Sequence, residues 1–360
     1  MRKILLILVL ISSFPIINFG QGCASTSSTE GVQVFGYIQP QVNYAFTKDL
    51  NTGIEEDAFN FSINRARLGV MGNIPYDFSY YVLAEFSPFK KQLGVNKDLS
   101  INEKNGPYLL DAFISYTRYK WAKISLGQFK SPFGLELGQT ACFDIKTVDR
   151  SSVVNDLTSP DREMGLMLSG GTDSTLFSYQ LAITNGIGII SLDNNMFKAI
   201  TGRIGIKPVE FLKLGVSAKY NKFVSVYNAD EDTTVRFGVD LELKKGNFTF
   251  QTEYIWGKDV GTYSTGSACV GDLQYHAGSL NRWGVFAQAL YMTSKNIQPV
   301  VKYEMYQTNA DNSSMNQFVT VGANYFFNDW TRLQLNYIMA REETLEVRND
   351  QVVLQIQVKF

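Results

Sequence analysis

The chain has very little of several residue types that particular classes of protein require. It holds one histidine, three cysteines and nine prolines among 360 residues. These numbers are too low for a zinc site of the usual Cys/His kind or for a disulfide-dense secreted domain. The formal net charge of −1 gives no overall attraction to nucleic acid. We therefore expect no cofactor, no metal ion and no nucleic-acid partner.

Long apolar runs are also missing, except near the start of the chain. Residues 1–22 have a basic start, a mostly apolar stretch and the small residues Gly20 and Gly22 as cleavage points. This pattern predicts a signal peptide, which leaves a mature domain over 23–360. Cys23 leaves open the alternative of a lipid-anchored start. No later stretch is apolar over about 18 residues, so a membrane passage would have to use strands.

Apolar and polar residues alternate along most of the remaining chain. Hydrophobic residues make up 45% of the sequence and aromatic residues 13%. Strict alternation over 8 to 14 residues recurs between turns and is typical of strands with two unlike faces. Only the segment 144–156 allows a short helix. The pattern predicts sixteen strands, at 32–46, 58–72, 78–89, 108–118, 121–130, 162–169, 175–185, 197–207, 211–222, 233–244, 247–257, 281–293, 297–307, 316–327, 330–341 and 351–360.

The connections between these strands distinguish a membrane barrel from a soluble sandwich, which would also alternate. Long and short connections alternate without exception along the chain. Both ends of the predicted sheet lie at the end of the barrel that carries the short connections. This is typical of an all-β, up-and-down barrel of antiparallel strands in the bacterial outer membrane. Sixteen strands give a water-filled channel. Aromatic residues gather at the short turns, as expected of a membrane-interface girdle: Tyr76, Phe78, Tyr119, Trp121, Phe326, Phe327, Trp330 and Phe360.

The polar face of each strand must then line the lumen, because the other face lies in lipid. The inward bases on this register are Lys123, Arg203, Lys207, Lys213, Lys219, Arg236, Lys302, Arg332 and Lys359. The inward acids are Glu85, Asp111, Asp240, Glu242, Glu253 and Glu304. Bases outnumber acids in the lumen, and we expect water in the channel to solvate these charges.

Several segments resemble the phosphate-selective porin O and P family, in its form common among Bacteroidetes. The resemblance is carried by INRARLGVMG (63–72), LLDAFISYTRYKWAKISLGQFKSPFGLE (109–136), VDRSSVVNDLTSPDREMGLMLSG (148–170), YQLAITNG (179–186), FQTEYIWG (250–257) and the terminal LQIQVKF. It implies a trimeric barrel, passive diffusion of small anions such as phosphate, and a third loop folded into the lumen. It also implies that acidic outer loops contact lipopolysaccharide.

Residues 131–161 form the longest connection, and we expect this loop to fold inward and narrow the channel. Arg65 and Arg67 share one face of the second strand, where two guanidiniums about 7 Å apart suit an anion. Candidate constriction residues are therefore Arg65, Arg67, Lys130, Lys146 and Arg150, with Asp149 beside them. Solvated loop charges outside the barrel remain the alternative for the loop residues.

Two positions depart from the family pattern. Members with a true phosphate site often carry a further Arg directly before the arginine pair and a Lys just after the FGLE segment. Here those positions hold Asn64 and Leu137. The resemblance therefore implies a weaker anion preference in place of tight phosphate selectivity.

Other functions remain open at this stage. A porin for another solute, such as polyphosphate or an organic acid, would share the whole pattern. An outer-membrane hydrolase would have to use the single histidine, His276, with Asp272 nearby in sequence, and nothing in the spacing adds a nucleophile. An adhesion protein would have longer outer loops. Cys142 and Cys269 both fall in long connections, where a disulfide between them and two isolated thiols are both open.

The terminal aromatic residue provides a first test. In the resembled family Phe360 is the signal that outer-membrane assembly machinery recognises, so deleting it should impair assembly. The yield of folded protein in the outer membrane, measured by its faster migration when unheated on a detergent gel, should fall. A normal yield of the truncated protein would contradict this role.

Overall fold

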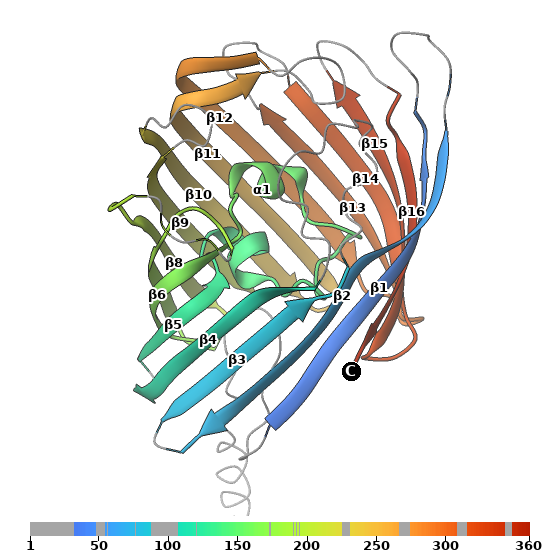
Figure 1. The fold of residues 1–360 in the computed structure, drawn as a ribbon. Coiled ribbons are helices and arrows are strands. Elements are labelled where there is room, and N and C mark those ends of the chain that lie inside the picture. Colours follow the sequence, from blue (N-terminus) through green and yellow to red (C-terminus); the bar gives the residue numbers. More distant parts are fainter. Residues whose placement is uncertain are drawn as a thin grey trace, which may run out of the picture.

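The computed structural model describes residues 32–47, 55, 57–75, 77–87, 107–119, 121–172, 174–189, 191, 193, 195–224, 231–265, 274–307, 315–342 and 348–360. These residues form one closed antiparallel barrel (Figure 1). The predicted signal peptide lies outside them. The strands are β1 (Val32–Ala45), β2 (Ala58–Ile74), β3 (Phe78–Glu85), β4 (Tyr108–Tyr119), β5 (Ala122–Lys130), β6 (Arg162–Gly170), β7 (Phe177–Thr184), β8 (Ala199–Val209), β9 (Leu212–Val224), β10 (Glu231–Lys245), β11 (Phe248–Thr265), β12 (Gln274–Tyr291), β13 (Ile297–Gln307), β14 (Met315–Phe326), β15 (Thr331–Glu342) and β16 (Gln351–Lys359).

The barrel closes where the first strand meets the last. β1 pairs antiparallel with β16, with Tyr37 opposite Lys359 and Val42 opposite Leu354. Beyond the end of β16, the N–H of Gly36 donates to the carbonyl of Phe360 at 2.9 Å, and the N–H of Phe360 donates back at 3.0 Å. The closed sheet has no open edge, and each of the sixteen strands pairs with its neighbours in the sequence. The predicted sixteen-stranded, up-and-down barrel is therefore confirmed.

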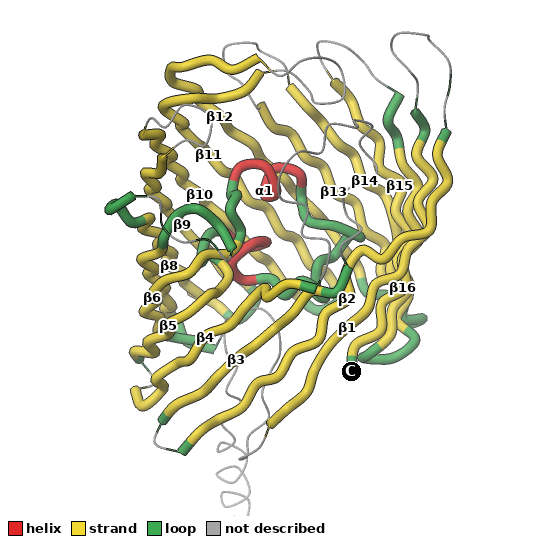
Figure 2. Tube along the Cα trace, viewed as in Figure 1, coloured by secondary structure: helices red, strands yellow, loops and turns green. Residues whose placement is uncertain are grey.

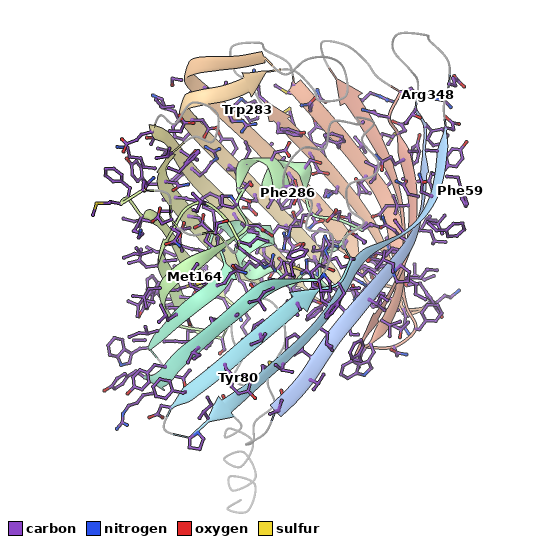
Figure 3. All side chains as sticks on the ribbon, viewed as in Figure 1. Phe59, Tyr80, Met164, Trp283, Phe286 and Arg348 are labelled. Atoms are coloured by element: carbon purple, nitrogen blue, oxygen red, sulfur yellow. The ribbon has the colours of Figure 1, made fainter. Side chains whose placement is uncertain are left out.

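The two faces of the sheet have the polarity that was predicted, which is the reverse of a soluble protein. On β16 the side chain of Ile356 is 38% exposed on the outside, whereas its neighbour Gln357 is 1% exposed on the inside. Apolar side chains cover the outer surface and polar ones fill the interior (Figure 3). At the short-turn end the outer surface carries exposed aromatic residues, among them Trp121 at 69%. This arrangement suits a barrel surrounded by lipid.

The connections differ from the prediction mainly at one hairpin. β11 and β12 stay paired out to Thr265 and Gln274, although the sequence analysis ended these strands at 257 and began the next at 281. Backbone pairing needs no apolar face, so a hairpin can continue where alternation fades and periodicity no longer reveals it. His276 consequently lies in β12, opposite Tyr263, and not in a loop.

The connection 131–161, called the inward loop from here on, lies inside the barrel as predicted. It contains a π-helix, η2 (Gly134–Gln139), and an α-helix, α1 (Ser152–Leu157). Both lie within the ring of strands in Figure 2. The helix expected over 144–156 occupies only its end, because residues 142–149 form turns and bends against the wall. Among the described residues, neither helix is long and apolar enough to cross a membrane.

An apolar contact seats the loop on one side of the lumen wall. The side chains involved are buried, and each helix contributes to the contact. Val153 of α1 lies against Gly284 of β12, where an added Cβ would approach the Val153 methyl to 2.6 Å. The cluster comprises Phe133, Leu137, Val153, Val154 and Leu157 of the loop with Ile255, Phe286 and Tyr306 of the wall. Burying this apolar surface favours the inward position of the loop.

Wall carboxylates accept hydrogen bonds from the helix starts, whose N–H groups have no partner within a helix. Oε2 of Glu253 accepts from the N–H groups of Leu135 at 3.1 Å and Glu136 at 3.0 Å. Oε1 of Glu304 accepts from the N–H of Ser152 at 2.7 Å. The same loop is therefore held by apolar contact and by hydrogen bonds to the wall.

Side-chain amides hold residues 143–148 of the loop from the part of the wall that follows the apolar seat. They come from β2, β14, β15 and β16, and they bind backbone groups of residues 143–148. We call this set the amide clamp. Its bonds run from Gln357 to the Phe143 carbonyl (3.1 Å), from Asn324 to Lys146 (2.9 Å), from Gln334 to Thr147 (3.3 Å), from Asn64 to Val148 (3.3 Å), and from the Val148 N–H to Asn336 Oδ1 (2.7 Å). The clamp sets the path of the loop independently of its side chains.

Removing one clamp residue should loosen the loop without opening the barrel. Asn336→Ala deletes the acceptor for the Val148 N–H, a loss of about 1 kcal/mol. We expect exchange of that amide hydrogen to accelerate about five-fold in mass-spectrometric hydrogen exchange on the folded barrel. Gln288→Ala is the matched control, since Gln288 is a buried lumen amide that binds Gln251 on the wall. Equal protection of Val148 in both variants would contradict the clamp.

Candidate functional site: the lumen constriction

A bulge in β2 turns two consecutive side chains into the lumen. The register between β1 and β2 shifts between Gln39 and Pro40, so that Gln39 faces Arg65 while Pro40 faces Ile63. The extra residue puts Asn64 and Arg65 on the same side of the sheet, and both are buried. Simple alternation predicted Arg65 on this face but not Asn64.

Arg65 and Arg67 both face the loop and both have acidic partners. Arg65 forms an ion pair with Asp149 of the inward loop, and its Nη1 donates to Oε1 of Gln39 at 3.0 Å. Nε of Arg67 donates to Oε2 of Glu85 at 2.6 Å. Nη1 of Arg67 is buried and has no hydrogen-bond partner among the described residues. One donor at this position is therefore left for a further acceptor.

A third guanidinium belongs to Arg162, which the sequence analysis did not single out. It is the first residue of β6, and its Nε donates to Oδ1 of Asp111 at 3.0 Å. Its Nη1 donates to Oδ2 of Asp161 at 2.8 Å. Burial would raise the pKa of Asp161, but Arg162 and then Arg150 lower it below its ordinary value. The position of Arg162 within the motif TSPDRE, at the exit of the longest loop, is the signal that could have revealed it.

Arg150 of the inward loop supplies the fourth guanidinium. Its Nη2 donates to Sγ of Cys142 at 3.1 Å, its Nη1 lies 3.6 Å from Asp161, and its side chain is 8% exposed. Its Nε is buried and has no hydrogen-bond partner among the described residues. Beside it lies a recess of about 120 Å³, lined also by Leu137, Asn155, Thr158, Ser159 and Asp161. We call Arg65, Arg67, Arg150 and Arg162 the arginine cluster.

The two candidate lysines flank this cluster. Lys130 lies opposite Arg162 in the β5–β6 ladder, and its Nζ donates to the carbonyl of Thr140 at 2.7 Å. Lys146 lies further along the loop, where burial, then Lys244 and Arg332 lower its pKa. Arg332 in turn interacts electrostatically with Arg65. The structure thus brings Arg65, Arg67 and Arg150 together, with Lys130 at one border and Lys146 at the other.

The other lumen charges point inward as predicted, but most of them are not solvated. Because the inward loop covers much of the wall, they are buried in ion pairs instead. Lys219 is an example, since its Nζ lies 3.1 Å from Oε1 of Glu163 and 3.5 Å from the carbonyl of Pro160. Further pairs join Arg203 to Asp240, Lys302 to Glu304 and Arg236 to Asp259. The expectation of water-solvated wall charges is therefore wrong for these pairs.

Cys142 is a buried thiol on the inward loop, packed beside Tyr37 and Ile145 inside the barrel. The long connection that contains it folds into the lumen, so the thiol does not lie outside the barrel. Cys269 lies outside the described residues, as does Asp272. Within the described parts of the chain, no three or more His, Cys, Asp or Glu side chains gather as a metal site would require.

Comparison with solved structures finds the same architecture at low sequence identity. An anion-selective porin from Comamonas acidovorans matches with a TM-score of 0.68 and 13% identity, covering 92% of this chain and 99% of that one. The outer-membrane channel DcaP of Acinetobacter baumannii matches with a TM-score of 0.65 and 13% identity, covering 93% and 100%. OmpT of Vibrio cholerae, in a trimer form, matches with a TM-score of 0.59 and 11% identity, covering 92% and 99%. These likenesses establish the porin fold.

Sequence comparison goes further than the fold. No curated protein matches the chain. The family model for phosphate-selective porin O and P matches residues 37–231, which include the arginine cluster and the whole inward loop. This match spans more than half of the chain and agrees with the closed sixteen-stranded barrel. The chain is therefore an outer-membrane porin, and it belongs to the phosphate-selective porin O and P family.

Proposed function

We propose that the protein lets small anions diffuse passively across the outer membrane, and that the arginine cluster is the point at which they are selected. The observation that carries this proposal is the pair of buried guanidinium nitrogens, Nη1 of Arg67 and Nε of Arg150, without hydrogen-bond partners among the described residues. Guanidinium groups keep their charge at all relevant pH values and bind oxyanions with several parallel donors. A passing anion supplies the missing acceptor.

The charge balance around the constriction makes the selectivity moderate. Four carboxylates, Glu85, Asp111, Asp149 and Asp161, face the four guanidiniums. The excess of positive charge comes from the neighbouring bases Lys130, Lys146, Lys244 and Arg332. Two further carboxylates, Asp144 and Glu242, interact electrostatically with bases of this group. Fields add in a narrow passage with low-dielectric walls, so even a small excess attracts anions.

Phosphate binds weakly in this proposal, because the two positions that depart from the family pattern hold the loop. Asn64 donates to the carbonyl of Val148 and, at 2.9 Å, to Oε1 of Gln355. Leu137 is buried in the apolar seat of the loop. Neither side chain adds positive charge to the passage. Other small anions, including organic acids and polyphosphate, share the same chemistry and remain alternatives for the solute.

Assembly and partners follow the family resemblance. We propose that the protein is exported with residues 1–22 as its signal peptide, and that the outer-membrane assembly machinery recognises Phe360. In the membrane it forms a homotrimer surrounded by lipopolysaccharide. Among the acids of the outer loops, Glu55 already forms an ion pair with Arg348 at 2.6 Å, which leaves fewer acids for bridging lipopolysaccharide. The role proposed is that of a channel, without catalysis; an enzyme assay for hydrolysis on the purified protein tests that part separately.

The reversal potential in a salt gradient tests the selection of anions. The intact channel should prefer chloride over potassium, and the preference should weaken toward 1 M salt, where the Debye length is about 3 Å. Arg65→Gln with Arg67→Gln should abolish or reverse it, since Asp149 and Glu85 then lose their partners. Arg118→Gln is the control, because Arg118 pairs with Asp77 at an exposed short turn, outside the arginine cluster. Cation preference of the unmodified channel would overturn the proposal.

The current block by phosphate tests the strength of binding. Added phosphate should reduce the chloride current only at millimolar or higher concentration, because Asn64 and Leu137 supply no charge; a Kd of 1 mM corresponds to about 4 kcal/mol. Asn64→Arg should strengthen the block, because it adds a guanidinium beside Arg65 on the lumen side of β2. Block of the unmodified channel at micromolar phosphate would show that the cluster binds far more tightly than proposed here.

A further inference from the structure

Cys142 lies among the guanidiniums of the constriction, which is an unusual place for a thiol. Its side chain is 1% exposed, and its Sγ accepts the hydrogen bond from Arg150 at 3.1 Å. It also interacts electrostatically with Arg65, Arg67 and Arg162. A buried sulfur that faces the whole arginine cluster is placed to act as one of its counter-charges.

A second observation points to an anion at this place. Nη1 of Arg67 is buried without a hydrogen-bond partner among the described residues, even though Nε of the same side chain binds Glu85. A buried donor that lacks an acceptor is costly. Negative charge on the sulfur beside it lowers that cost, and nearby arginines are the usual means by which proteins favour a thiolate over a thiol.

Cys142 also differs from the surrounding groups in the pH range over which a side chain of its type ordinarily changes charge. The ordinary pKa of a thiol is about 8.5, whereas carboxylates titrate near 4, tyrosine and lysine near 10, and arginine above 12. Asp161 titrates lower still, as described above. The charged and titratable groups that contact Cys142 or interact with it electrostatically are Tyr37 of β1, Arg65 and Arg67 of β2, Arg162 of β6, and Arg150 and Asp161 of the loop. Around them lie Glu85 of β3, Asp111 of β4 and Asp149 of the loop, each paired with one of these arginines, and Lys130 of β5, which is opposite Arg162.

We propose that Cys142 is a specificity-determining residue of the channel. As a thiolate it offsets one positive charge of the arginine cluster, and as a thiol it leaves that charge to a passing anion. The step is the loss or gain of one proton to water, and no other reactant takes part. This inference rests on the proposed anion selectivity and names the group that adjusts it.

The consequence is a channel whose anion preference falls as the pH rises through the titration of the thiol. One unit charge acting over about 8 Å in water changes the preference about two-fold. Lys146 also loses positive charge at high pH, and its pKa is lowered by burial, so the contribution of the thiol has to be isolated by mutation.

The experiment compares reversal potentials of the unmodified channel, Cys142→Ser and Cys269→Ser between about pH 6 and pH 9. The unmodified channel and Cys269→Ser should lose about half of their anion preference over this range. Cys142→Ser should keep the anion preference seen at low pH. Its anion preference should fall at high pH only by the amount that deprotonation of Lys146 causes. Identical pH profiles for all three channels would overturn the inference, whereas absence of anion preference at every pH would overturn the proposed function instead.

A spectroscopic measurement covers the case in which Cys142→Ser does not fold. Thiolates absorb in the ultraviolet and thiols do not, so Cys142→Ala and the unmodified barrel, compared in detergent over the same pH range, give the titration of Cys142 by difference. We expect a thiolate to be present at neutral pH. A difference that appears only above about pH 9, beyond the ordinary thiol value, would refute the role of the sulfur as a counter-charge.

Discussion

Backbone hydrogen bonding constrains this molecule more than any other interaction, and it does so in two places. In lipid, an unpaired N–H or C=O is too costly, so the sheet has to close, as β1 does on β16. Closure turns the polar side chains inward. In the lumen, residues 146–148 of the inward loop pair with no strand, and the amides of Asn324, Gln334 and Asn336 supply the partners that a strand would give.

The charges of the lumen follow from that arrangement. A loop that lies against the wall excludes water from the wall charges, and a buried charge without a partner is unstable. The lumen therefore holds pairs such as Lys302 with Glu304. At the constriction, Arg67 and Arg150 keep buried donors without hydrogen-bond partners among the described residues, as does the neighbouring Arg332. A solute can act as the counter-ion at this place.

The sequence predicts the parts of this structure that depend on local pattern. Alternation of apolar and polar residues located sixteen strands, and it put Arg65, Glu253 and Glu304 on the inner face. It did not reveal the bulge that turns Asn64 inward, because the strand was interpreted with a single phase. The extra residue shifts the outward apolar positions from Phe59 and Phe61 to Leu68. Alternation also missed Arg162, whose role depends on Asp111 and Asp161. The amide clamp joins residues far apart in the chain, for which periodicity carries no information.

Asn64 and Leu137, the two positions at which the sequence departs from the family pattern, both hold the loop. A side chain that donates to the Val148 carbonyl, or that is buried in the apolar seat, cannot also reach into the passage. A residue at either position can therefore hold the loop or bind an anion, but it cannot do both. In this chain both positions hold the loop. Anion selectivity therefore depends on Arg65, Arg67, Arg150 and Arg162, and on the charge state of Cys142 among them.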